Sequence, residues 1–299
     1  MIRITSNTLA ARLTSDLSRL SSNQSRLSQE MASGKRLVDA SDDVPATGRV
    51  MGYESEKRQL QQFERNAKIG LTDIAVSTTA LNSIKDIANQ VFNLAPAAAA
   101  SGDPNQYGAI ANQINGLLEQ ATSMANTQVS GNYLFGAQAT ASAPFSVTRN
   151  VAGQITAITY NGSAGAAPAI AVSDGAQVAT TNDGTQNGQL ASFLNTLVSL
   201  RDSVASNNKP ATTTFQNTLG DDEGRIVNMV SNLATSQFRI AATQAQNTAR
   251  FNQLANLSNG ETDVDMAETI VKYQTSDRSY QAALSAGSKM LQKSLLDYI

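Results

Sequence analysis

The sequence contains no cysteine and no histidine among its 299 residues. Zinc sites built on thiolate or imidazole ligands are therefore excluded, as are the Ser–His and Cys–His pairs that activate a nucleophile. Disulfide bonds are excluded too, so a protein working outside the cell would depend on packing and assembly for its stability. Enzymes that use only carboxylates, lysine or serine remain open. We nevertheless expect no catalytic residue, no metal and no cofactor.

Neither sign of charge dominates, because 22 lysine and arginine residues stand against 24 aspartate and glutamate residues. A nucleic-acid partner requires a basic face, and we expect none. No apolar run approaches the ~18–20 residues of a membrane span, so membrane insertion is not expected. The first residues lack the apolar core and the small-residue cleavage site of a secretory signal. An exported protein with this sequence would need a route without a cleaved signal peptide.

Both ends of the chain carry apolar residues at alternating spacings of three and four. This pattern predicts helices that pack along one seam against another helix. The residues expected at subunit interfaces come from these two stripes: Leu13, Leu17, Leu20, Leu27, Met31, Ile270, Tyr273, Tyr280, Leu284, Leu291 and Leu295. Polar residues and glycine, such as Gln24, Asp277 and Gly287, also occupy stripe positions. Both seams are therefore thin in large apolar side chains.

Punctuating residues divide the rest of the helical pattern. Gly34 stands where a helix C-cap glycine belongs, and a cap motif of Ser41, Asp42, Asp43 and Pro45 predicts the start of a second helix. The second stripe reaches residue 91, before an Ala-Pro-Ala run and Gly-Asp-Pro at 102–104 that should interrupt it. Further helices are expected at 107–124, 190–204 and 215–257. A capping-box candidate at 262–265 predicts the start of the last helix.

The pattern changes between Gly131 and Gly188. Residues 154–160 alternate with period two and are rich in β-branched side chains, which predicts a strand. Gly-containing dipeptides at 152–153, 161–162, 174–175 and 183–184 are typical of turns. We therefore expect a small β domain inserted between helical segments.

The predicted fold class is mainly α with a β-containing insert. It is a long antiparallel helical rod or coiled coil of paired N- and C-terminal helices, with a small outer α/β domain. The expected divisions are an N-terminal assembly helix at 1–40, ascending rod helices at 41–130 and a β-rich outer domain at 131–188. Descending rod helices at 189–260 and a C-terminal assembly helix at 261–299 complete the chain.

Several motifs resemble the flagellin and hook-associated protein superfamily over nearly the whole chain. The first runs from Ser33-Gly34-Lys35-Arg36-Leu37 to the cap motif. A second, outer-domain motif comprises Gly131, Tyr133, Phe135, Tyr160 and Gly162, within Gly-Asn-Tyr-Leu-Phe-Gly at 131–136 and Ile-Thr-Tyr-Asn-Gly at 158–162. Together with the C-terminal Ser-Leu-Leu-Asp-Tyr-Ile, it is closer to the hook–filament junction branch than to flagellins. Ala137 and Ser163 depart from the usual pattern.

The resemblance implies a structural subunit of the bacterial flagellum, not an enzyme. Its expected partners are further copies of itself in a helical layer, another hook-associated protein on the hook side, flagellin on the filament side and a flagellar export chaperone. The implied location is extracellular, on the flagellum, after type III export without a cleaved signal peptide. Two alternatives stay open: a short flagellin, and a secreted enzyme housed in the β insert, whose only carboxylates are Asp174 and Asp183.

The terminal segments, residues 133–135 and the Asp42/Asp43 pair each allow two interpretations. The thin seams suggest that residues 1–40 and 265–299 are mobile in the monomer and fold when neighbours cover them, because ordering costs ~1–2 kcal/mol per residue. An ordinary intramolecular coiled coil is the alternative. Tyr133, Leu134 and Phe135 form either a recognition patch or the core contacts of a strand. Asp42 and Asp43 are expected to cap a helix rather than to bind a metal.

Overall fold

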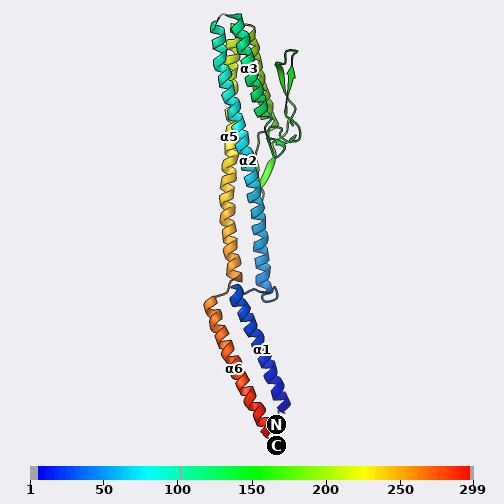
Figure 1. Cartoon of the computed structure of the whole chain (residues 1–299), viewed down its shortest axis with the longest axis vertical. Helices are drawn as coiled ribbons and strands as arrows, with labels where there is room; N and C mark the ends of the chain where they lie inside the picture. The colour runs from blue at the N-terminus through cyan, green and yellow to red at the C-terminus, as the bar shows by residue number, and fades with distance from the viewer. Residues whose placement is uncertain (1–5, 102, 297–299) are drawn as a thin grey trace. The chain divides into compact units, whose positions relative to one another are not determined.

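The computed structural model describes residues 6–101 and 103–296 (Figure 1). Six helices in this part of the chain account for most of its residues, and the mainly α class with a small β insert is confirmed. The chain forms two compact units, one combining residues up to 59 with residues from 250 onward, and the other comprising residues 60–249. No helix of the described residues is long and apolar enough to cross a membrane.

In the first unit, α1 (Ser6–Ser33) runs antiparallel to α6 (Met266–Leu296). Gly34 ends α1 with a φ of 67°, the left-handed conformation that glycine adopts without strain, as predicted. Asp43 caps α2 (Val44–Ser101) by accepting from Ala46 N at 3.0 Å, whereas Asp42 accepts from the preceding loop. Asp265 caps α6. The capping box expected to open at residue 262 is wrong, because that residue still belongs to the preceding helix.

The second unit is built from parts of α2 and α5 (Lys209–Thr262), with α3 (Pro104–Ala125) and α4 (Gly184–Ala205). Asp103 caps α3, and Asp183 forms a capping box with Gln186 at the start of α4. One continuous apolar core joins these helices, and its largest fully buried side chains are Ile74, Leu81, Ile84, Ile114, Leu118, Phe135, Ile155, Leu190, Phe193, Leu194, Leu197 and Leu200.

The second helix does not stop near residue 91, as the proline predicted, but continues through Pro96 to Ser101. Proline lacks an N–H group, so it leaves the carbonyl four residues earlier without its helical partner. That carbonyl belongs to Phe92, and Gln216 of α5 donates to it at 3.2 Å. A tertiary contact thus compensates for the proline, and no local pattern in the sequence reports it.

The insert consists of three separate antiparallel ribbons rather than one sheet. They pair β1 (Gln128–Val129) with β2 (Asn132–Tyr133), β3 (Phe145–Arg149) with β4 (Ile155–Tyr160), and β5 (Ala169–Ser173) with β6 (Ala176–Ala179). Figure 1 shows the strands on one side of the helices of this unit. The expected turns at Gly153 and Gly175 are confirmed, and both residues have positive φ.

Asparagine side chains on the helices, or at the end of α3, hydrogen-bond to these ribbons. Asn126 exchanges two hydrogen bonds with the backbone of Phe145, at 2.9 and 3.0 Å. Asn195 does the same with Ile158, at 2.7 and 2.9 Å. Asn247 donates to a β5 carbonyl at 2.8 Å. An isolated two-stranded ribbon is marginal in water, so these amides supply the partners that further strands would otherwise provide.

The outer-domain motif lies in this insert and is largely structural. Gly131, with a φ of 84°, occupies the β1–β2 turn, and Phe135 is completely buried. Tyr160 packs against Phe145 with ring centroids 5.4 Å apart and donates to Ser163 O at 3.1 Å. Gly162 lies against the Tyr160 ring, leaving no room for a side chain. Of the two interpretations of this segment, core contact holds for Phe135 and its neighbour at 134, whereas Tyr133 is half-buried.

Candidate assembly interface

The α1–α6 pair of the first unit has an unequal seam. On α1, Leu27 is buried, and Leu13, Leu17, Leu20 and Met31 are half-buried. On α6 the seam combines two tyrosines with small and polar residues: Thr269, Tyr273, Ser276, Tyr280, Ala283 and Gly287. Gly287 allows the closest approach, because a Cβ atom there would lie 2.5 Å from Leu13 Cδ2. Apart from the two tyrosines, the α6 residues opposite the α1 leucines offer little apolar area.

Two predicted seam residues point elsewhere. Ile270 is 42% exposed and Leu284 is 46% exposed, so neither packs in the seam with α1, and their place at a subunit interface stays a prediction. The residues one position earlier, Thr269 and Ala283, lie in the seam instead. The stripe in the sequence marks the apolar residues of this helix, whereas the residues that contact α1 lie on a neighbouring part of its surface. Leu291 and Leu295 belong to α6, but their side chains lie outside the described residues.

Polar groups occupy part of the seam. Gln24 donates to Asp277 at 3.0 Å and lies 3.5 Å from the hydroxyl of Tyr273. Ser276 is 6% exposed, and its hydroxyl has no hydrogen-bond partner within the described chain. A buried hydroxyl without a partner opposes pairing. The pair is consequently weaker than its length of about eight helical turns suggests.

An open groove runs beside this seam. It has a volume of about 360 Å³, and Leu20, Leu27 and Val271 supply its apolar lining. Val271 is 62% exposed, and Met266 and Ile270, on the same helix, are also exposed. The apolar surface that α6 does not use against α1 is therefore available to another helix.

The α1–α2 and α5–α6 connectors are joined by a connector clamp, which we define as Lys35, Arg36, Asp43, Arg49, Glu261 and Asp263. Lys35 pairs with Asp263 at 2.5 Å, and Arg36 pairs with Asp43 at 3.0 Å. Arg49 binds both carboxylate oxygens of Glu261, at 2.8 and 2.9 Å. Bidentate pairs of this kind fix orientation as well as distance. The clamp therefore ties the start of α2 to the end of α5.

Two backbone hydrogen bonds reinforce the clamp. Arg36 N donates to Thr262 O at 2.7 Å, and Val264 N donates to Gly34 O at 3.1 Å. Arg36 also donates through its side chain to Glu261 O at 2.9 Å. The first superfamily motif, read from the sequence only as a signature, thus has a structural role at this connection.

The clamp carboxylates are held in their charged form. The hydrogen bond from Arg49 lowers the pKa of Glu261, and the hydrogen bond from Lys35 lowers the pKa of Asp263. For Asp43, the backbone N–H of Ala46 is the main cause of a lowered pKa, followed by Arg36. A carboxyl with a lowered pKa stabilises the folded state above its unfolded pKa and loses that contribution as the pH falls through its folded pKa.

We predict that the clamp opens in acid. Protection of the Arg36 and Val264 amides from hydrogen exchange, relative to an unfolded peptide at the same pH, should be constant from pH 7 to about 5 and fall below about pH 4. Nuclear magnetic resonance exchange measurements on the full chain would test this. In Glu261→Gln, protection should be lower at neutral pH and depend less on acid. Equal protection at pH 7 and pH 3 in the native chain would contradict the prediction.

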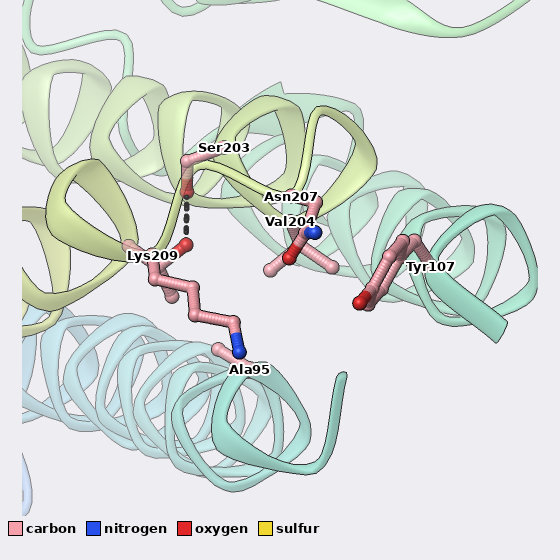
Figure 2. A pocket seen from close by; sticks show the side chains of 7 residues that line it. Ala95, Tyr107, Ser203, Val204, Asn207 and Lys209 are labelled. Atoms are coloured by element: carbon pink, nitrogen blue, oxygen red, sulfur yellow. Dashed lines mark hydrogen bonds between the residues drawn. The ribbon is translucent and has the colours of Figure 1, made fainter. Parts of the chain in front are cut away.

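Two further kinds of candidate site lie in the described residues, a metal site and a substrate pocket. No three acidic side chains of residues 6–101 and 103–296 lie close enough to share a metal ion, and Asp42 and Asp43 bind backbone N–H groups. Figure 2 shows a polar pocket between Ala95, Tyr107 and Lys209, where Ser203 and Thr212 share a hydrogen bond of 3.0 Å. Its volume is about 10 Å³, which is room for one water molecule. A substrate does not fit there.

A known protein family matches the N-terminal part of the chain. Residues 4–140 match the family described as the bacterial flagellin N-terminal helical region. This match contains the connector residues of the first motif and the Gly131–Phe135 part of the outer-domain motif. Over residues 4–140 it agrees with the resemblance stated from the sequence. No match was found among curated proteins.

Solved structures share the fold. A flagellar hook-associated protein from Vibrio parahaemolyticus has a TM-score of 0.65 at 16% identity, over 74% of this chain and 100% of its own. FlgL from Bacillus cereus has a TM-score of 0.59 at 15% identity, over 71% and 100%. The flagellar junction protein FlgL from Legionella pneumophila has a TM-score of 0.52 at 11% identity, over 72% and 100%.

Proposed function

We propose that this chain is a structural subunit of the bacterial flagellum. Its residues 4–140 match the bacterial flagellin N-terminal helical region, and its fold is that of hook-associated proteins. Within the flagellum we assign it to the hook–filament junction, as a protein of the hook-associated protein 3 type. The matched family and the solved neighbours are structural proteins, and we assign no enzymatic activity to the chain.

One observation supports assembly through the terminal helices. The apolar side chains of Ile270, Val271 and Leu284 on α6 are exposed, while the seam against α1 combines two tyrosines with small and polar residues. Burial of apolar area yields ~25 cal/mol per Å², so covering these exposed side chains would further stabilise an assembled subunit. An interface with a neighbouring subunit would explain why α6 has apolar residues on its solvent-exposed surface.

The finer assignments follow from the same proposal. Copies of the chain would form a layer, with another hook-associated protein on the hook side and flagellin on the filament side. The terminal helices would line the inner tube and the ribbons of the second unit would face outward. Export would proceed without a cleaved signal peptide, and an export chaperone would cover the exposed faces of α1 and α6 beforehand.

Immunogold electron microscopy would test the location. The epitope belongs in the β3–β4 turn, because Val151 is fully exposed there, whereas Gly162, the other candidate turn, lies against Tyr160. We expect label in a narrow band at the hook–filament boundary. Label along the whole filament would identify a short flagellin instead. Absence of label on flagella, with the tagged chain shown to be exported, would refute the flagellar assignment.

A further inference from the structure

Phe238 is the most exposed aromatic side chain in the described part of the second unit, at 77%. It lies two residues from the fully buried Ile240, which is about 200° around the helix, so it points away from the core. Ala234 and Ala241, one turn to either side, are small, and the phenyl ring therefore stands above the surface of α5. Val227, on the same face, is 45% exposed.

The same unit has an apolar hollow elsewhere on its surface. Ala75, Val76, Thr79 and Ala80 of α2 line it, together with Met124 and Thr127 from the end of α3. Its volume is about 290 Å³. A cavity of about 150 Å³ accommodates a benzene ring. The hollow is larger than that, so the ring of a phenylalanine side chain fits in it.

The chain cannot fill its own hollow with Phe238, because that side chain points outward from α5 while α2 and α3 form the hollow. The two features also lie at different levels along the helices. Glu64 hydrogen-bonds with Gln244, and Phe92 with Gln216, so residue 238 is level with residue 70 of α2. The hollow, centred about seven residues further along α2, is displaced by roughly 10 Å.

We infer that Phe238 of one copy inserts into the hollow lined by Ala75, Val76 and Met124 of a neighbouring copy. This lateral contact rests on the proposed function, since it needs copies held side by side. The contact is heterologous, because the two surfaces differ, and it therefore propagates from copy to copy instead of closing a dimer. Because the two surfaces lie at different levels along the helices, each copy is displaced along the helix axis relative to its neighbour.

The area explains why this contact belongs to the assembly and not to a dimer in solution. A buried aromatic side chain accounts for about 150–250 Å², whereas a specific stable interface buries at least about 1,200 Å². Copies already held by their terminal helices experience a high effective concentration, at which a small apolar contact forms. There it determines the lateral spacing of the second units.

The absence of cysteine makes a direct test available. The double variant Thr79→Cys/Ala241→Cys keeps Phe238 and places one thiol at the rim of the hollow and one beside the phenyl ring. Flagella carrying it would be isolated and treated with a short bifunctional thiol reagent. We expect a ladder of cross-linked chains on denaturing gels. The ladder should be lost when Phe238→Ala is added, and absent from the control pair Val151→Cys/Ala241→Cys.

Each other outcome has a distinct meaning. No ladder in flagella that contain the double variant would overturn the lateral contact and leave the proposed function intact. Dimers formed by Ala241→Cys alone would overturn the heterologous arrangement in favour of a symmetric one. Absence of the native chain from isolated flagella would refute the proposed function, and the lateral contact with it.

Discussion

Leu27→Asp should separate α1 from α6 and abolish incorporation of the chain at the hook. Leu27 is 3% exposed, and on α1 it is the one buried leucine of the described seam. Its replacement removes the apolar contact and places an unpaired carboxylate beside Glu30, which is itself 4% exposed. We expect a loss of about 3 kcal/mol or more from the α1–α6 pair.

The measurement combines two readouts. Far-ultraviolet circular dichroism should lose the helical signal of α1 and α6, while the thermal transition of the second unit is unchanged. Immunoblots of isolated flagella should lose the chain. Ser28→Asp is the matched control, because it adds the same carboxylate one residue away at an exposed position and should behave like the native chain. Normal incorporation of Leu27→Asp would contradict the role of this seam.

The positions of the helices were predictable because their signals are local. Gly34 ends α1 and aspartate begins α2, α3 and α4, and each acts through hydrogen bonds to groups within a few residues. The turn glycines at 153 and 175 are equally local. Sequence patterns identify such features because the interacting groups are near one another in the chain.

The errors concern contacts between distant segments. The helix passes Pro96 because Gln216, 120 positions later, binds the carbonyl that the proline leaves free. The sequence predicts the small β insert but not its division into separate ribbons, whose strands are bound by helix asparagines such as Asn195.

The α6 seam shows the same limit for the candidate site. Periodicity detects an apolar face, yet it does not say which partner covers that face. Ile270 and Leu284 belong to the apolar stripe of the sequence, yet in the single chain neither packs against α1. Only the partner helix reveals that Thr269 and Ser276 occupy the seam, and that the apolar residues face outward.

The amides of α1 and α6 should exchange with solvent at least about 100-fold faster in the dilute monomer than those of α2 between residues 67 and 91. A hundredfold difference corresponds to about 2.7 kcal/mol of opening free energy. The physical reason is the contrast between the two units. The α2 segment buries Ile74, Leu81, Ile84 and Val91 in a continuous core, whereas α6 offers α1 a hydroxyl without a partner at Ser276 and a glycine at 287.

Hydrogen–deuterium exchange with mass spectrometry on the full chain would measure this difference, and Ser276→Ala provides the matched variant. Alanine removes the unpaired buried hydroxyl and is a better helix former, so exchange across α1 and α6 should slow by about tenfold, or about 1.4 kcal/mol. Exchange in α2 should be unchanged. In the assembled flagellum the same α1 and α6 amides should be protected if neighbouring copies cover Ile270 and Leu284, as we propose. Equally slow exchange of α1, α6 and α2 in the monomer would instead establish an ordinary intramolecular coiled coil, and the terminal helices would then enter the assembly already folded.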